Sequence, residues 1–190
     1  GVHSHIEHLF AILEMCKREN FQRVYVHPFF DGRDTPPASG KEYLEQLINK
    51  MKELGVGQVA TLSGRYYSMD RDNNWDRVQK TYDALVLGEG IKDTDPLHAM
   101  QASYDNNVTD EFVLPTVITK EDGTPVATVK ENDSIIFFNF RPDRARELTK
   151  AFCYSDSDIA AMDGDASDSK CIKSLKRAKG FIPVVFVCFK

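Results

Sequence analysis

Short apolar runs alternate with amphipathic helices along the first part of this 190-residue chain, and this alternation limits the folds that it can adopt. The apolar spacing predicts helices over residues 4–20 and 38–54, and it predicts buried strands over 24–30 and 59–62. Strands and helices that follow one another at this spacing are typical of βα units with a parallel sheet covered on both faces. We therefore expect the α/β class.

The middle of the chain adds two more predicted helices, over 74–87 and 95–106. Residues 112–119 and 125–129 flank the turn signal Glu121-Asp122-Gly123 and predict a hairpin. A hairpin introduces antiparallel pairing into a sheet that is otherwise parallel. The expected architecture is three-layer α/β/α with a mixed, mostly parallel sheet.

The last part of the chain contains its clearest predicted strand, over 134–140. Pro142 follows at the expected first turn of a helix over 142–152, where its preset φ and missing N–H are tolerated. Residues 153–180 are rich in Ser, Asp, Lys and Gly, which predicts a linker or irregular segment. A final apolar run covers 182–189.

Composition narrows the class of protein. The longest apolar runs are too short to cross a bilayer, and the net charge of −5 disfavours a broad grip on nucleic acid. The 4 cysteines form no C-x-x-C pair, so we expect free thiols in a reducing cytoplasm. The chain opens on Gly-Val-His without Met, as an excised segment of a longer protein would.

Polar clusters follow the predicted strands and carry arginines to one edge of the sheet. In an open α/β sheet, the ligand crevice forms outside the carboxyl ends of the strands. Arginine keeps its charge at any working pH, and its planar fork matches carboxylate and phosphate oxygens. These side chains therefore predict a small polyanionic ligand. They are Arg33, Arg65, Arg71, Arg141 and Arg144.

The alternative is that these arginines are solvated or paired with neighbouring aspartates. The available partners are Asp31, Asp34, Asp70, Asp72 and Asp143. Repetition of the pattern after separate strands favours the ligand. A carboxylate held among arginines remains a hydrogen-bond acceptor, suited to orienting the hydroxyl of a sugar acid or taking its proton. Asp34 is the candidate for this role.

Histidines at the start of the chain suggest a second kind of site. His3, His5 and His8, with Glu7, offer side chains that bind zinc, which would make the protein a histidine-metal hydrolase. His3 precedes the expected helix cap at Ser4, so it points away from the other two. We expect His3, near the helix N-terminus, to contact an anion, with His5 and His8 structural.

Several other chemistries find no support. The chain contains no phosphate-binding G-x-x-x-x-G-K-[ST] or G-x-G-x-x-G motif and no G-x-S-x-G nucleophile elbow. Trp75 and the pair Tyr66 and Tyr67 have no basic stripe between them, so we expect packing roles and no nucleic-acid partner. The residues indicate how a ligand is held and leave open which group breaks a bond.

Several longer motifs, in the same order along the first 152 residues, closely resemble the substrate-binding domain of cofactor-independent phosphoglycerate mutase. They are Gly-Val-His-Ser-His-Ile-Glu-His from residue 1, Asp31–Pro37, Ser63–Asp72, Thr109–Phe112 and Phe138–Glu147. The resemblance implies that residues 1–190 are the substrate-binding (phosphotransferase) domain of a larger two-domain isomerase of glycolysis and gluconeogenesis. That enzyme interconverts 3-phosphoglycerate and 2-phosphoglycerate without bisphosphoglycerate.

In that family, as the resemblance implies, a second domain similar to alkaline phosphatase carries a nucleophilic serine and two Mn²⁺ ions, and the serine holds the phosphoryl group in transit. The resemblance also implies a soluble cytoplasmic monomer. Carried over by motif, the substrate pocket contains Asp34 as the catalytic residue that orients or deprotonates the attacking hydroxyl. The substrate-binding residues are His3, Arg33, Asp34, Arg65, Arg71, Arg141 and Arg144.

The chain departs from the family pattern in ways that give further expectations. It has no counterpart of the family's serine or manganese-binding motifs, so we predict that this chain alone binds no metal and does not isomerise phosphoglycerate. The family also has sequence ahead of the Gly-Val-His motif, including a further strand of this domain. A non-enzymatic anion-binding module is the remaining alternative.

Overall fold

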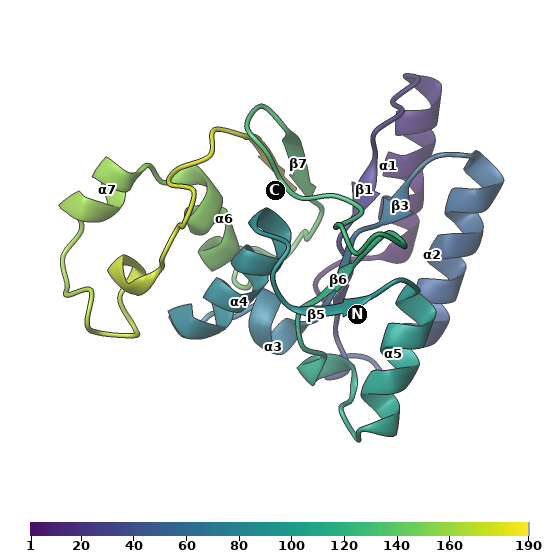
Figure 1. Ribbon diagram of the computed structural model, residues 1–190, viewed down its shortest axis with the longest axis horizontal. Coiled ribbons are helices and arrows are strands. Elements are labelled where there is room, and N and C mark those ends of the chain that lie inside the picture. The colour runs from purple at the N-terminus through teal and green to yellow at the C-terminus, as the bar shows by residue number, and fades with distance from the viewer. Residues whose placement is uncertain (190) are drawn as a thin grey trace.

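The strands lie in the middle of the molecule, between two groups of helices (Figure 1). The computed structural model describes residues 1–189. On one side lie α1 (Ile6–Arg18), α2 (Gly40–Leu54) and α5 (Pro96–Asp105). On the other side lie α4 (Trp75–Val86) and α6 (Arg146–Cys153), with α7 (Asp156–Ala161) farther out. The short elements are α3 (Arg65–Ser68) and the 3-10 turns η1 (Asp110–Phe112) and η2 (Ile172–Ser174). Helices on both faces of the strands confirm the predicted α/β class.

The strands form three sets, which are mixed and mostly parallel as predicted. The strands are β1 (Tyr25–Val26), β2 (Phe29–Phe30), β3 (Gln58–Val59), β4 (Thr61–Gly64), β5 (Ile91–Asp93), β6 (Thr116–Ile118), β7 (Ser134–Phe137) and β8 (Val185–Cys188). The central set has the order β2-β4-β6-β5, in which only the β4–β6 pair is antiparallel. β1 pairs in parallel with β3, and β7 pairs in parallel with β8.

Pro28 divides the strand predicted over 24–30 into β1 and β2. Proline has no N–H for a strand ladder, so the chain changes partner here, from β3 to β4. The Pro28 carbonyl still accepts a hydrogen bond of 3.1 Å from the Ser63 N–H. β1 and β2 therefore follow each other directly along the chain, and the carboxyl end of β2 lies beside β4.

Only the first arm of the predicted hairpin forms a strand. β6 is its first arm, and the turn closes through the Gly123 N–H, which donates to the Lys120 carbonyl at 2.9 Å. The second arm, residues 125–129, is limited to a bridge between Thr119 and Pro125. A proline at the first position of that arm removes one ladder donor, which accounts for the short pairing.

Two helices begin later than predicted. The cap of α1 is His5, whose Nδ1 accepts the Glu7 N–H at 3.2 Å, so Ser4 is not the cap. α6 begins at Arg146, so Arg141 and Arg144 lie in the irregular turn ahead of the helix and not one turn apart within it. Ser4, Arg141 and Arg144 therefore lie outside the two helices.

Two hydrophobic clusters hold the layers together. One packs α1 and α2 against the strands through Leu13, Leu44 and Leu62, each at most 1% exposed. The other packs α4 against α6 and includes Tyr82 and Phe152, whose ring centroids lie 5.1 Å apart. Burial of this many large side chains is the main stabilising contribution to a fold of this size.

Residues 153–180 are irregular for most of their length, but they are part of the packed structure. Their short helix α7 begins with a capping box at Ser155. Ile159, Ile172 and Leu175 are buried in the cluster around α4 and α6. These apolar side chains fix the segment against the domain.

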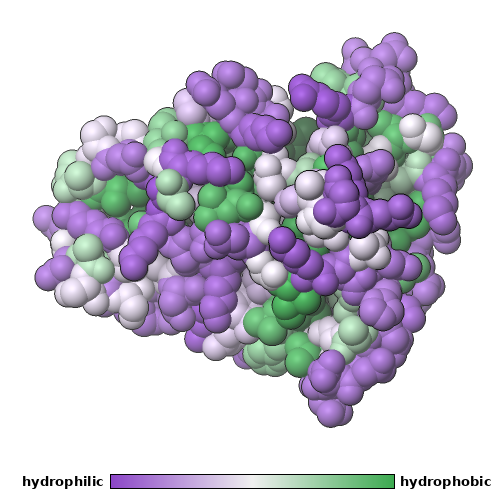
Figure 2. Space-filling model, viewed as in Figure 1, coloured by the Kyte–Doolittle hydropathy of each residue, from purple (hydrophilic) through white to green (hydrophobic). Residues whose placement is uncertain are grey.

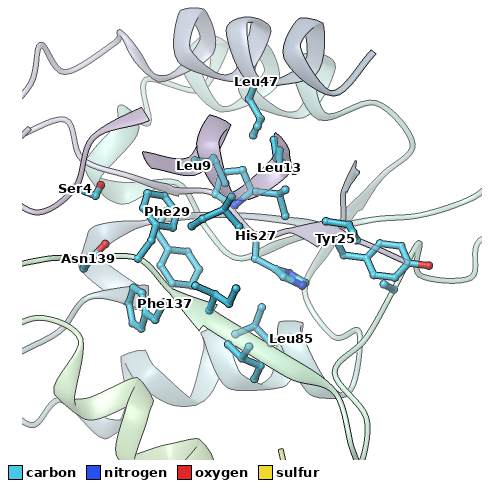
Figure 3. A pocket seen from close by; sticks show the side chains of 18 of the residues that line it. Ser4, Leu9, Leu13, Tyr25, His27, Phe29, Leu47, Leu85, Phe137 and Asn139 are labelled. Atoms are coloured by element: carbon cyan, nitrogen blue, oxygen red, sulfur yellow. The ribbon is translucent and has the colours of Figure 1, made fainter. Parts of the chain in front are cut away.

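A cavity of about 1260 Å³ lies between the β1–β2 line and β7 (Figure 3). Most of its labelled lining is apolar, including Leu9, Tyr25, Phe29 and Phe137. The space-filling view is hollowed between the same elements, and hydrophobic surface is visible inside (Figure 2). Within residues 1–189, β1 pairs only with β3 and β7 only with β8, so one edge of each strand is free of ladder bonds.

Candidate functional site

The parallel pairing of β2 and β4 brings two of the predicted polar loops together. Phe30 is in register with Gly64, so Asp31 and Arg65 are the next residues at the same end of neighbouring strands. The carboxyl ends of parallel strands share one edge of a sheet, which is where a ligand crevice forms. The loop after β7 joins them through residue 3, because the Phe140 N–H donates to the His3 carbonyl at 3.0 Å.

Arg65 is the centre of the resulting cluster. It is 3% exposed, and its Nη1 donates to Asp31 Oδ1 at 2.7 Å and to Asp34 Oδ2 at 2.6 Å. Burial alone would lower the pKa of the Arg65 guanidinium, but the hydrogen bonds from the two aspartates raise it above its ordinary value. Arg65 is therefore a permanent cation that holds two carboxylates in place.

His3 is buried among these groups. Its Nε2 lies 3.7 Å from Asp34 Oδ2 and 3.5 Å from Arg65 Nη2, and its Nδ1 lies 3.9 Å from Asp143 Oδ1. Burial, and next the positive charge of Arg65, lower the pKa of His3. A neutral imidazole can donate from one nitrogen and accept at the other, which suits contact with a hydroxyl or a carboxylate of a ligand.

Asp143 connects two further arginines to the cluster. Arg71 Nη1 lies 3.1 Å from Asp143 Oδ2, and Arg141 Nε lies 2.9 Å from Asp143 Oδ1. Burial opposes ionisation of Asp143, but the hydrogen bonds from Arg71 and Arg141 hold its pKa below the ordinary value. Both arginines are nearly half exposed, so part of each guanidinium faces solvent and can receive a ligand.

Arg144 is less exposed than Arg71 and Arg141. It donates to the Met69 carbonyl at 3.0 Å, and its Nε has no partner among the described residues. The Nε of Arg65 is likewise without a partner in the part of the chain that the structure describes. Burial, followed by the positive charges of Arg65 and Arg71, lowers the pKa of Arg144. Guanidinium groups held this close favour the arrival of an anion.

Arg33 stands apart from the other predicted residues. Its side chain is 66% exposed and pairs with Glu111 Oε1 at 3.4 Å. Five of the seven predicted residues are thus linked by contacts of 3.9 Å or less, directly or through Asp143: they are His3, Asp34, Arg65, Arg71 and Arg141. Arg144 interacts with the group through its charge, and the Arg33 N–H donates to Asp31 Oδ1 at 3.2 Å.

The turn around Asp110 supports the cluster, and sequence reasoning gave it no role. The Asp110 carboxylate accepts the Gly40 N–H at 2.7 Å and the hydroxyl of Tyr104. A Cβ on Gly64 would lie 2.3 Å from the Glu111 carbonyl oxygen, and one on Gly32 would lie 2.7 Å from the Glu111 nitrogen. The glycines before Arg33 and Arg65 therefore allow this turn to pack against both loops.

Two buried carboxyls, Asp70 and Glu147, also support the site; sequence reasoning considered Asp70 only as a partner of the arginines and gave Glu147 no role. Each is 4% exposed, and both bind the backbone of the loop that carries Arg71. Buried acidic side chains with backbone partners are rare, so a charged residue in a helix pattern is read as exposed by default. The only available signal was their place within the Ser63–Asp72 and Phe138–Glu147 motifs.

The described residues do not provide a metal centre. They contain no group of three or more histidine, cysteine, aspartate or glutamate side chains that could hold an ion. His3 lies in the arginine cluster, while the ring centroids of His5, the cap of α1, and His8, in its first turn, lie 5.9 Å apart. His3 is therefore separated from the other two histidines that suggested a metal hydrolase.

The cluster is suited to a small anion with more than one acidic group. Arg65, Arg71, Arg141 and Arg144 face the carboxylates of Asp31, Asp34 and Asp143, so cations are in excess. Bidentate arginines give both charge and orientation to phosphate or carboxylate oxygens. No helix among residues 1–189 is long and apolar enough to cross a membrane.

Comparison with known proteins matches this chain to one family. Residues 1–178 match the family model described as BPG-independent PGAM N-terminus. The chain is 54% identical, over 189 residues, to the 2,3-bisphosphoglycerate-independent phosphoglycerate mutase of Lachnoclostridium phytofermentans, covering 100% of this chain and 34% of the relative. It is 62% identical, over 151 residues, to the Clostridium perfringens (strain ATCC 13124) mutase, covering 80% of this chain and 29% of the relative.

A solved structure agrees. The chain matches a crystal structure of Leishmania mexicana phosphoglycerate mutase at low cobalt concentration, with a TM-score of 0.82 and 25% identity, over 98% of this chain and 33% of that one. The chain therefore belongs to the family of N-terminal domains of the BPG-independent phosphoglycerate mutases. It spans about a third of the length of the curated relatives that it matches.

Proposed function

We propose that this chain is the substrate-binding domain of a cofactor-independent phosphoglycerate mutase, an isomerase that interconverts 3-phosphoglycerate and 2-phosphoglycerate. The observation that carries the proposal is the convergence of Arg65, Arg71, Arg141 and Arg144 around Asp143 and Asp34, in a chain that belongs to the mutase family. A phosphoglycerate carries a phosphate and a carboxylate, and a group of arginines with different exposures can hold both.

Each arginine has a role that follows from its surroundings. Arg71 and Arg141, with exposed N–H groups, meet the phosphate or carboxylate as it enters. Arg144 and Arg65 hold the inner end of the glycerate through their unsatisfied Nε groups. Arg33 closes over the glycerate from the loop that it shares with Asp34.

Asp34 and His3 act on the glycerate hydroxyl. Asp34 Oδ2 lies 2.6 Å from Arg65 Nη1 and 3.7 Å from His3 Nε2, and its side chain is 33% exposed. Its free oxygen can accept the proton of the hydroxyl that attacks the phosphoryl group, and His3 orients the same hydroxyl. Phosphoryl transfer depends mainly on positioning and charge neutralisation, and this pocket provides both.

The bond exchange itself is assigned to another part of the protein. In the full-length protein, the family's second domain would hold the nucleophilic serine and two Mn²⁺ ions, and the ions would activate that serine. The described residues contain no cluster of side chains that fits either ion, so both ions are assigned to that other part of the protein. The partner is the phosphatase-like domain of the same protein, and the chain by itself is inactive.

The cavity between β1 and β7 fits the same proposal. It is lined largely by apolar side chains, and the strands that border it have edges without ladder bonds within the described residues. An extended segment from the remainder of the protein would complete this sheet by pairing with both edges. We further place the enzyme in the cytoplasm as a monomer.

Binding of 3-phosphoglycerate to the chain tests the proposal. Calorimetry and thermal melting compare 3-phosphoglycerate with glycerate and with inorganic phosphate, each at the same concentration. We expect 3-phosphoglycerate to bind best, because it alone has the two acidic groups needed to contact both the exposed pair Arg71 and Arg141 and the inner pair Arg65 and Arg144. Arg141→Ala is expected to weaken binding by about tenfold or more, while Arg18→Ala, at the exposed end of α1, leaves it unchanged.

Two results would count against the proposal. Equal binding of phosphate and 3-phosphoglycerate, insensitive to Arg141→Ala, would indicate a general anion-binding module. Turnover of 3-phosphoglycerate by the chain alone, in an assay coupled to enolase, would contradict the assignment of bond exchange to a separate domain.

A further inference from the structure

Glu147 lies on the first turn of α6, immediately after the turn that carries Arg141 and Arg144. Its side chain is buried, and its Oε1 accepts the backbone N–H of Asn73 at 2.9 Å. Its Oε2 has no partner among the residues described. A carboxyl taken out of water in this way is costly, so its retention needs a reason other than packing.

The loop that Glu147 binds also wraps around a second buried carboxyl. Asp70 Oδ2 accepts the N–H groups of Asp72 at 3.0 Å and Asn74 at 2.8 Å, and Arg77 Nη1 lies 3.2 Å from Asp70 Oδ1. Asp70 lies between α3 and α4, and it shapes the loop by binding these two backbone N–H groups. Glu147 is the contact that joins this loop to α6.

The hydrogen bond to Glu147 also holds an unfavourable backbone conformation in the loop. Asn73 has a φ of 57°, in the left-handed region that non-glycine residues adopt at a cost. The Asn73 N–H points at Glu147, so the hydrogen bond compensates the unfavourable backbone conformation. Arg71 lies two residues earlier on the same loop, and its guanidinium reaches Asp143 at 3.1 Å.

We infer that Glu147 is a positioning residue of the substrate site: it fixes the Arg71 loop to the start of α6, and so sets the spacing of Arg71 relative to Arg141 and Arg144. This inference rests on the proposed function for its ligand. The contact joins residues that are 74 apart in the sequence, which is why a local motif does not reveal it.

The charged groups around Glu147 make its hydrogen bond with the Asn73 N–H depend on whether the Glu147 carboxyl is protonated. Burial, and then the negative charges of Asp70 and Asp72, raise the pKa of Glu147 to about 7. Two cations contact the loop: Arg77 of α4 pairs with Asp70, and Lys170 Nζ donates to the Asp72 carbonyl at 3.0 Å. An ionised Glu147 accepts the Asn73 N–H more strongly than a neutral one does.

Amide NMR of the 190-residue chain tests the contact without any ligand. The Asn73 amide shift is expected to follow a titration in the neutral pH range in the wild type. That titration is expected to vanish in Glu147→Gln, which keeps an acceptor of the same shape. Thr149→Ala is the matched control, because it removes a hydrogen bond to the Ala145 carbonyl within the same helix and leaves the Asn73 titration in place.

A double-mutant cycle on 3-phosphoglycerate affinity tests the positioning role. We expect Glu147→Ala to weaken binding by about tenfold, Glu147→Gln to recover most of that loss, and Glu147→Ala to add little in an Arg71→Ala background. Thermal melting of each variant separates loss of fold from loss of position. Equal losses with and without Arg71, or an Asn73 amide that ignores Glu147, would overturn the inference.

The NMR titration and the double-mutant cycle together distinguish failure of this inference from failure of the proposed function. Failure of the wild-type chain to bind 3-phosphoglycerate would count against the proposed function, while the Asn73 titration would still decide whether Glu147 holds the loop. An intact titration with additive losses in the cycle would overturn the positioning role and leave the proposed function standing.

Discussion

The guanidinium of Arg65 lies 2.6 Å from the carboxylate of Asp34, although Arg65 begins α3 after β4 and Asp34 lies in the loop after β2. The same nitrogen donates to Asp31 at 2.7 Å. One buried cation therefore joins the β2 and β4 ends of the sheet, and the shape of the pocket depends on it.

Replacement of Arg65 is expected to destabilise the fold. Arg65→Ala leaves Asp31 and Asp34 side by side without their shared cation, and breaking a buried ion pair in this way costs about 3 kcal/mol. Urea denaturation measures the free energy of unfolding. Arg18→Ala is the control and is expected to stay within about 0.5 kcal/mol of the wild type. Equal stability of the two variants would show that the cluster does not hold the strand ends together.

Glu147 is expected to make stability depend on pH. Its pKa is raised from 4.5 to about 7 by burial, so below pH 4.5 it is protonated in both the folded and unfolded states and carries no penalty. As pH rises toward 7 the unfolded chain ionises first, and up to about 3 kcal/mol of stability is lost. Glu147→Gln is expected to remove that loss.

The measurement is the free energy of unfolding at pH values from 4.5 to 8 in the wild type and in Glu147→Gln. The gap between the two is expected to widen in favour of the variant as pH rises. Glu45→Gln, on the exposed face of α2, is the control and keeps a constant gap. A constant gap for Glu147→Gln as well would contradict the prediction.

Gly64 is expected to tolerate no side chain. A Cβ there would lie 2.3 Å from the Glu111 carbonyl oxygen and 2.6 Å from that of Asp110, and backbone atoms cannot move away easily. Gly64→Ala is expected to lower stability by about 3 kcal/mol and to weaken 3-phosphoglycerate binding, because the Arg33 and Arg65 loops pack on this turn.

Gly123→Ala separates this steric effect from a backbone effect. Gly123 has a φ of +80° but open space around it, so alanine there is expected to cost about 1 kcal/mol and leave binding unchanged. Thermal melting and calorimetry on both variants provide the comparison. A smaller loss at Gly64 than at Gly123 would mean that the turn is free to move.

The cavity edges are expected to exchange hydrogen quickly in the chain by itself. Amides of β1 and β7 at the cavity have no ladder partners among residues 1–189, whereas β4 is paired on both sides. Presence of the rest of the protein is expected to slow exchange at the cavity edges by about a hundredfold and to change β4 little. Hydrogen-exchange mass spectrometry measures both segments, and no difference at β1 and β7 would leave the cavity without a partner strand.

The arrangement of the strand ends could be predicted from sequence, because the polar loops each follow an apolar run. Arg71 and Arg141 meet at Asp143 for that reason. The predicted pairing of arginines with aspartates also occurs, alongside the proposed ligand role. His3 was predicted to contact an anion because of its place ahead of a helix, and that role stays a prediction; the structure places His3 Nε2 3.5 Å from Arg65 Nη2.

Other features depend on tertiary contacts that periodicity does not report. His5 caps α1 because its ring accepts an amide, an uncommon use of histidine that a capping pattern based on Ser4 does not predict. Glu147 lies in an amphipathic helix but faces inward, since its partner is a backbone N–H from a distant loop. Ile159 and Ile172 are isolated apolar residues in a polar stretch, and only the packing of that stretch against α4 and α6 reveals their role.

The carboxylates of Asp31, Asp34 and Asp143 already occupy arginine donors that an incoming phosphate would use. Binding of the proposed phosphoglycerate would thus exchange one set of anionic partners for another, so the net attraction would be smaller than the number of arginines suggests. In the proposed function, this weaker attraction would favour release of the product as well as uptake of the substrate. The same internal competitors that weaken its hold also speed the departure of whatever it has held.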